Sequence, residues 1–176
     1  SPAAGVMYIG NCASVEITES TFEGNSAVGN GGVFQIKGGK VTIADCTFNK
    51  NHSDGYAGVM EVTDATEDGV VLTGCTFTGN SGTTSGTISV ATGCYLKLAD
   101  CQFSENVGTK EGNDIRLGGD STVVKLSGKM DVDIFNRQLS TLYVDGSLTA
   151  GSDVMVDWAS DKTITDGMVG IQFSDA

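Results

Sequence analysis

The chain has 176 residues, enough for one domain with a sizeable core. Its 22 acidic and 10 basic residues give a net charge of -12, which repels a phosphate backbone, so we expect no nucleic acid as a partner. With 25 glycines and 1 proline the composition favours short strands and tight turns over long helices. No apolar run approaches the ~18 residues of a membrane span, so we expect no membrane insertion by this fragment.

The N-terminal stretch SPAAGVMYIGNCASV lacks the basic region and apolar stretch of a signal peptide. Two explanations stay open, a cytosolic protein or a mature or excised piece of a secreted one. The internal repeats described next favour the second.

A strand is predicted after each of five equivalent small residues. These residues are Gly5, Gly32, Gly58, Gly86 and Asn113. Two residues further on the side chain is apolar in all five cases: Met7, Phe34, Met60, Ile88 and Ile115. Four residues further on it is again apolar: Ile9, Ile36, Val62, Val90 and Leu117. Such alternation indicates a strand with one buried face.

The rest of the unit is anchored on four Phe-x-x-Asn segments, in which the phenylalanines follow one another at steps of 26, 29 and 26 residues. The pairs are Phe22/Asn25, Phe48/Asn51, Phe77/Asn80 and Phe103/Asn106. Positions seven and five residues before each Phe are apolar, which predicts a second strand. The inward-facing positions lie five and two residues before the Phe, an odd separation that breaks the alternation of the second strand. This break indicates a bend or bulge followed by a third, short strand.

Periods of this size are typical of solenoids. One unit cannot bury its own apolar face, whereas stacking equivalent positions about 4.8 Å apart gives every strand a parallel neighbour and a continuous core. The sequence therefore predicts an all-β parallel β-helix of about 26 to 29 residues per rung. A βαβ solenoid would need helical segments that are absent, and an antiparallel sandwich would not require this position-by-position repetition.

The Phe-x-x-Asn motif is interpreted as a corner of the coil. Phe would stack as an internal aromatic column, and Asn would occupy a turn, tolerate left-handed φ and form an amide ladder. The cysteines of one column, Cys46, Cys75 and Cys101, are predicted to be core residues. Cys12 and Cys94 lie near another column and too far apart for a disulfide. With no C-x2-C pair and His52 as the one histidine, a zinc site is excluded.

The insertion TDATEDG, residues 63–69, accounts for the 29-residue step as a loop that leaves one rung. Exposed loops of this kind often bind partners, so it is the candidate contact loop. Its candidate residues are Thr63, Asp64, Glu67 and Asp68. Its acidic DATED stretch also suggests a calcium ligand set, but no EF-hand or G-G-x-G-x-D repeat supports one, and we expect no metal site and no cofactor.

Residues 1–117 are predicted to form regular β-helix rungs. Residues 118–176 keep alternating patterns but lose Phe-x-x-Asn, so we expect shorter strands that continue the same domain as degenerate rungs or a cap. A cap, or further chain, would protect the strand edges at the end of the solenoid. Trp158 belongs to this part and is interpreted as a core or capping residue.

The four Phe-x-x-Asn segments, together with GNGGVFQI, YAGVMEV and TSGTISV, resemble the repeat of chlamydial polymorphic outer membrane proteins and of adhesin-like surface proteins of bacteria and archaea. That repeat pairs Phe-x-x-Asn with a Gly-Gly-Ala-(Ile/Leu/Val) motif, to which Gly31-Gly32-Val33-Phe34 comes closest. The resemblance implies a right-handed parallel β-helix, exported to the cell surface and used in adhesion. It supplies no catalytic residues.

We therefore expect a non-enzymatic, adhesin-like module of a secreted or cell-surface protein. Its partners would be a glycan or a host or matrix protein, together with further domains of the same chain. The alternative is a structural spacer that holds another domain away from the cell.

A polysaccharide-active enzyme is the third possibility, because β-helices often carry lyases and glycosidases. The two arginines, Arg116 and Arg137, have no aligned cluster around them in the sequence. Asp45 and Asp100 share an outward column two rungs apart but lack a cleft. His52 has no Ser or Cys partner in sequence and is interpreted as a solvated turn residue. No catalytic residue is therefore predicted.

Overall fold

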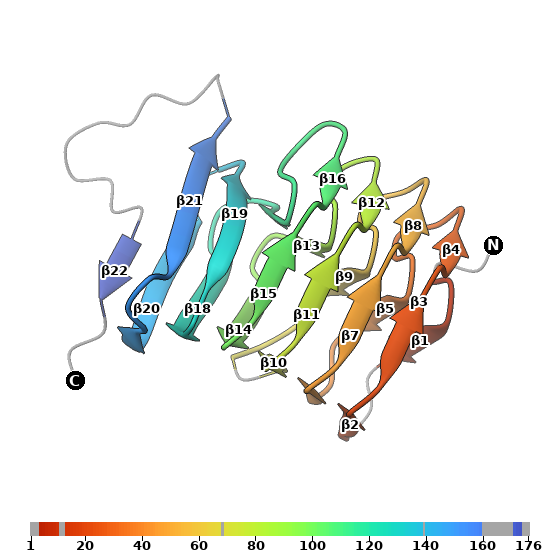
Figure 1. Cartoon of the computed structure of the whole chain (residues 1–176), viewed down its shortest axis with the longest axis horizontal. Coiled ribbons are helices and arrows are strands. Elements are labelled where there is room, and N and C mark those ends of the chain that lie inside the picture. Colours follow the sequence, from red (N-terminus) through yellow and green to blue (C-terminus); the bar gives the residue numbers. More distant parts are fainter. Residues whose placement is uncertain (1–3, 11–12, 68, 139, 160–170, 174–176) are drawn as a thin grey trace.

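The computed structural model describes residues 4–10, 13–67, 69–138, 140–159 and 171–173, the last three for their backbone alone. The chain winds into a parallel β-solenoid of about six turns, whose strands lie side by side from the N-terminal to the C-terminal end (Figure 1). The predicted all-β parallel β-helix is therefore confirmed. Nothing in the described ranges forms a helix capable of crossing a membrane.

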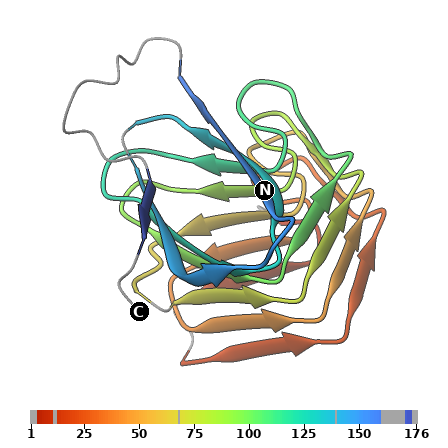
Figure 2. The same ribbon diagram turned by 60° about the vertical axis from the view of Figure 1, so that its left-hand side comes forward.

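Each regular turn contributes four short strands, and equivalent strands of successive turns form parallel ladders (Figure 2). The first ladder contains β1 (Met7–Gly10), β5 (Phe34–Lys37), β9 (Met60–Thr63), β13 (Ile88–Val90) and β17 (Ile115–Leu117). The second contains β2 (Val15–Thr18), β6 (Val41–Ala44), β10 (Val70–Thr73), β14 (Tyr95–Ala99), β18 (Val123–Gly128), β20 (Thr141–Leu148) and β22 (Ile171–Phe173).

The third ladder contains β3 (Thr21–Glu23), β7 (Thr47–Asn49), β11 (Thr76–Thr78) and β15 (Gln102–Ser104). The fourth contains β4 (Ser26–Ala27), β8 (His52–Ser53), β12 (Ser81–Gly82) and β16 (Val107–Gly108). Two later strands, β19 (Asp131–Asn136) and β21 (Asp153–Trp158), extend the sheet to which the first and third ladders both belong.

The register of the ladders places the predicted columns in line. In the first ladder Phe34 pairs with Met60 and Met60 with Ile88, and in the second Ile43 pairs with Leu72 and Leu72 with Leu98. Apart from the most N-terminal turn, these inward side chains are fully buried and form one continuous core. The column assignment from the Phe anchor is therefore confirmed.

The Phe column is confirmed as a stack of parallel rings. Centroids of successive rings lie 5.2, 4.9 and 4.6 Å apart from Phe22 to Phe103. Spacings of this size match the distance between strands, so each ring fills the core directly above the next.

The Asn column forms a continuous amide ladder inside the corner. Nδ2 of Asn51 donates to Oδ1 of Asn80 at 3.0 Å, and Nδ2 of Asn80 donates to Oδ1 of Asn106 at 3.0 Å. The same Nδ2 atoms donate to backbone carbonyls of the preceding turn, as Asn80 does to the carbonyl of Phe48. Phe-x-x-Asn is thus a structural corner, as predicted.

Two columns of left-handed residues make the corners. The predicted bend before each Phe lies at Glu19, Asp45, Gly74 and Asp100, with φ between 47° and 63°. At the second corner the left-handed residue was expected to be the Asn itself, and this was wrong. The residue before each Asn has the left-handed conformation: Gly24, Lys50, Gly79 and Glu105. The Asn must keep its side chain directed inward for the ladder.

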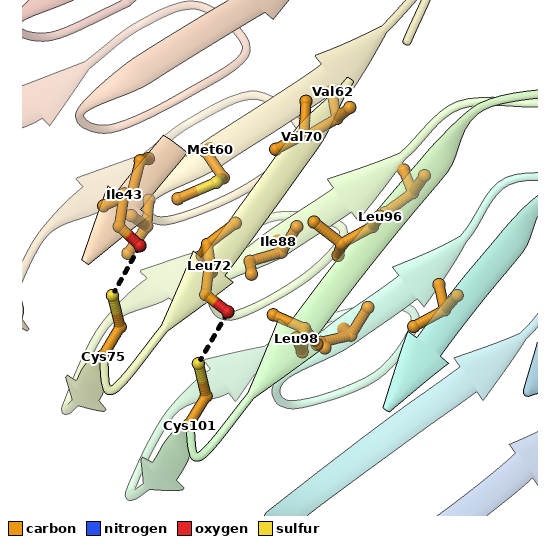
Figure 3. Close-up of a cluster of buried hydrophobic side chains, with 14 of the residues drawn as sticks. Ile43, Met60, Val62, Val70, Leu72, Cys75, Ile88, Leu96, Leu98 and Cys101 are labelled. Carbon is orange, nitrogen blue, oxygen red and sulfur yellow. Dashed lines mark hydrogen bonds between the residues drawn. The ribbon is translucent and has the colours of Figure 1, made fainter. Parts of the chain in front are cut away.

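The buried thiols occupy the predicted core column. Cys75 and Cys101 each point their Sγ at a carbonyl of the preceding turn, Ile43 at 3.6 Å and Leu72 at 3.7 Å (Figure 3). Contact with Cys75 and burial raise the pKa of the Cys101 thiol, and burial raises that of Cys46. The Cys46 and Cys101 thiols therefore stay protonated, whereas the hydrogen bond with Cys101 lowers the pKa of Cys75. All three side chains are buried and pack as small apolar residues. Cys12 lies outside the described residues.

Beyond residue 118 the coil changes its shape. The expectation of shorter strands was wrong for four of the five described strands: β18, β19 and β21 have 6 residues and β20 has 8, whereas strands β1 to β17 have 2 to 5. Strand β22 has 3 residues. With no Phe-x-x-Asn corner, β19 runs straight from Asp131, which pairs with β15, to Asn136, which pairs with β17. Residues 160–170 of the predicted C-terminal part lie outside the described residues.

The Asn ladder ends on a buried carboxyl group. Nδ2 of Asn106 donates to Oδ1 of Asp114 at 2.9 Å, and the backbone N–H of Asp133 donates to Oδ2 at 2.8 Å. Burial raises the pKa of Asp114 from 3.8 to about 6, against the effect of these two hydrogen bonds, and the carboxylates of Asp133 and Asp131 act with burial.

Because the folded-state pKa of Asp114 lies above the unfolded-state value, its protonation stabilises the fold. The contribution is complete below about pH 4 and is lost as the pH rises through about 6. The difference between the folded-state and unfolded-state pKa values of Asp114 corresponds to roughly 3 kcal/mol in the free energy of unfolding. Between about pH 4 and pH 7 we expect the free energy of unfolding to fall by about 2–3 kcal/mol more in the wild type than in Asp114→Asn. Urea titrations at both pH values measure this, and equal falls would contradict it.

Candidate ligand-binding site

A surface pocket of about 270 Å³ lies on the outer face of the second ladder, over β14, β18 and β20. The inward side chains of these strands belong to the core, so their alternate residues face outward. The residues that line the pocket are Glu67, Tyr95, Val123, Lys125, Tyr143 and Asp145. Two tyrosines, one lysine and two carboxylates therefore meet on one sheet face; we call this the tyrosine pocket.

The candidate contact loop contributes Glu67 to the tyrosine pocket. Between β9 and β10 it has six residues, 64–69, where the preceding turn has the three residues 38–40 between β5 and β6. Ala65 anchors the loop, because it is buried and its carbonyl accepts a hydrogen bond from the N–H of Tyr95. Glu67 can then reach over β14 to Lys125, with Oε1 and Nζ 3.0 Å apart.

A second ion pair crosses the same face. Nζ of Lys97 on β14 lies 3.1 Å from Oδ2 of Asp145 on β20, and so spans the intervening strand β18. Both of its side chains are more than a third exposed, so the pair contributes little to stability. Its effect is to orient the carboxylate of Asp145, which lines the pocket with Tyr95 and Tyr143.

The predicted loop residues divide into three groups. Glu67 lines the pocket. Thr63 ends β9 and donates its Oγ1 hydrogen to the carbonyl of Ile36, and Asp64 has φ of 53° at the start of the loop, so neither is a pocket residue. Asp68 lies outside the described residues.

The other lining residues were not predicted from the sequence. A signal was present, because YLKL, VVKL and LYVD each contain two apolar residues at the inward positions of the ladder. Their alternation places Tyr95, Lys125 and Tyr143 on the outer face. The contact of the loop with Lys125 could not be read from local pattern, since the two residues lie 58 positions apart.

Stacking supplies neighbours from other turns to two kinds of residue that have none in the sequence. The arginines, which have no aligned cluster around them in the sequence, both line a second pocket together with Glu61. His52, interpreted as a solvated residue, is half exposed, and its Nδ1 lies 2.9 Å from Oγ of Ser81 and its Nε2 3.1 Å from Asp54. The His52 and Asp54 side chains are at least half exposed and neither described pocket includes them, so we assign this trio to a surface network.

The tyrosine pocket combines two tyrosines with charged side chains. Tyrosine offers a rigid apolar ring with a polar tip, and such residues dominate the energetics of many binding surfaces. Within the described ranges, no group of three or more His, Cys, Asp or Glu side chains is placed to hold a metal ion.

Comparison with protein families matches residues 4–156 to the right-handed β-helix region. The match covers most of the chain, so the protein belongs to this family, and its solenoid is right-handed. No curated protein and no solved structure matches the chain significantly.

Proposed function

We propose that the chain is a non-enzymatic, adhesin-like module of a secreted or cell-surface protein, and that the tyrosine pocket binds its ligand. The observation that carries the proposal is the position of Glu67. Glu67 comes from the insertion at residues 63–69, lines the pocket that contains two tyrosines, and forms an ion pair with Lys125 across β14.

Three features support binding rather than catalysis. The pocket combines aromatic rings, a lysine and carboxylates, which together suit a glycan or a host or matrix protein. All the lining side chains except that of Glu67 are held on strands of a rigid scaffold, which favours precise presentation. The resemblance to adhesin-like repeats, together with an acidic surface that favours solubility, suits a protein outside the cell.

The proposal is tested with an array of glycans and matrix proteins, probed with the wild type and two matched variants. Tyr143→Ser removes a ring from the pocket, whereas Tyr8→Ser removes an exposed tyrosine from β1 in the first ladder. We expect a saturable hit that Tyr143→Ser weakens at least about tenfold, the loss of one hot-spot residue, while Tyr8→Ser changes it less than about twofold.

Two outcomes would contradict the proposal. Equal weakening by both variants would place the contact elsewhere. A blank array with folded wild type would favour the spacer, whose function requires stacking alone.

A further inference from the structure

A second pocket of about 200 Å³ lies on the outer face of the first ladder, separate from the tyrosine pocket. One outward column of this ladder contains Gln35, Glu61, Ser89 and Arg116 in register. Ser89 is therefore a small residue between two long charged ones. Ala91 and Gly118 line the pocket beside it, so small residues open a depression in the sheet face.

Both arginines of the chain line this pocket. Arg116 is 7% exposed, and its Nε donates to Oε2 of Glu111 at 2.6 Å. Nη1 of Arg137 lies 3.6 Å from the other carboxylate oxygen, Oε1. A guanidinium has five N–H donors. The bonds described for Arg116 use Nε and, at 3.5 Å to Ser89, Nη1, so this wall can offer further donors to a ligand.

The opposite wall of the second pocket is a hydrogen-bond acceptor, the carboxylate of Glu61. Glu61 is 8% exposed, and its Oε2 accepts hydrogen bonds from Nδ2 of Asn30 at 2.7 Å and from Nε2 of Gln35 at 2.9 Å. These two amides hold the carboxylate in a fixed orientation. Glu61 on β9 and Arg116 on β17 are separated by β13, so their backbones lie about 10 Å apart, at two strand spacings.

The charges of the site balance, because two guanidinium groups face two carboxylates. A local charge near zero gives no attraction for an anion, and the net charge of -12 on the chain repels one. To an uncharged ligand the pocket offers a wall of hydrogen-bond donors, a wall of acceptors, the hydroxyls of Ser89 and Thr92, and the partly exposed ring of Tyr56.

We propose that this pocket binds a single uncharged sugar ring. Each sugar hydroxyl both donates and accepts, so one ring can bond to Glu61 and to the guanidinium groups at once. The apolar face of the ring can pack on Tyr56. The cavity is smaller than the ~300–1,000 Å³ of pockets for drug-sized ligands, which fits one ring rather than a longer chain. The site is independent of the tyrosine pocket.

The test uses titration calorimetry and ligand-observed NMR with methyl glycosides of neutral hexoses and N-acetylhexosamines, and with methyl glucuronide as the anionic probe. Ser89→Gln fills the depression with the residue type found in the same column at Gln35, so the fold should tolerate it. Ser104→Gln, on exposed β15, is the matched control.

We expect a neutral glycoside to bind the wild type, and Ser89→Gln to weaken binding at least about tenfold, while Ser104→Gln changes it less than about twofold. Three results would overturn the proposal. The first is that no neutral glycoside binds the folded wild type. The second is that the glucuronide binds more tightly than every neutral probe. The third is that the Ser89→Gln variant binds the neutral glycoside as tightly as the wild type does.

Discussion

Replacing Asn80 by alanine is expected to lower the free energy of unfolding by at least about 3 kcal/mol, because it leaves several buried polar groups without partners. Oδ1 of Asn80 accepts hydrogen bonds from the backbone N–H and from Nδ2 of Asn51, at 2.9 and 3.0 Å. Its Nδ2 also satisfies the carbonyl of Phe48. All of these groups lie in a corner from which water is excluded, since Asn51 and Asn80 are 0% exposed.

The matched control is Asn49→Ala on the outer face. Nδ2 of Asn49 donates only to Oε1 of exposed Glu23 among the described contacts. This substitution should change the free energy of unfolding by no more than about 0.5 kcal/mol. Chemical denaturation of both variants measures the difference. Similar losses for the two variants would show that the internal amide ladder is not a main source of stability.

Replacing Gly58 by alanine is expected to cost about 3 kcal/mol or more, because overpacking forces backbone shifts. A Cβ atom at Gly58 would lie 2.2 Å from the carbonyl oxygen of Gly86 and 2.6 Å from that of Ser81, both of them backbone atoms. The same close approach recurs at Gly32, whose Cβ would meet the carbonyl of Gly58 at 1.9 Å. The glycine column is thus required by the stacking distance between turns.

Gly79→Ala is the control for the Gly58 variant. Gly79 has φ of 62°, but an added Cβ would meet only the Lys50 side chain, at 3.5 Å. Lys50 and Glu105 hold similar φ values in the same column, so this substitution should cost only about 1–2 kcal/mol. Thermal unfolding ranks the two variants, and an equal or larger loss for Gly79→Ala would argue against close stacking at Gly58.

The repetition of the sequence explains why most of the fold could be predicted. Each turn places the same residue types at the same positions, so Phe48, Phe77 and Phe103 identify one column without any structural information. The alternation around them then indicates which side chains face the core. Left-handed φ at Lys50 and Glu105 was not predicted, because neither residue type favours that conformation, and the requirement comes from directing the following Asn inward.

The C-terminal part could be predicted less well for a related reason. Without Phe-x-x-Asn there is no local signal for where a turn begins, and β19 merges two strands into one. Alternating patterns indicate strands but do not determine how many corners separate them.

The sites depend on contacts between turns, which the sequence does not display. The loop could be selected because its insertion breaks the period, and Glu67 does line the tyrosine pocket. Tyr95 and Tyr143 come together only because β14 and β20 flank the same strand. Arg116 and Arg137 likewise meet through Glu111, which no periodic column includes.

The most direct test of the central claim is an NMR footprint of a ligand identified on the array. Backbone and side-chain resonances of the wild type would be compared with and without that ligand. The tyrosine pocket predicts the largest shifts at Glu67, Tyr95, Lys125 and Tyr143, with the third ladder unaffected. Shifts confined to another face, with the resonances of these four residues unchanged, would contradict the account.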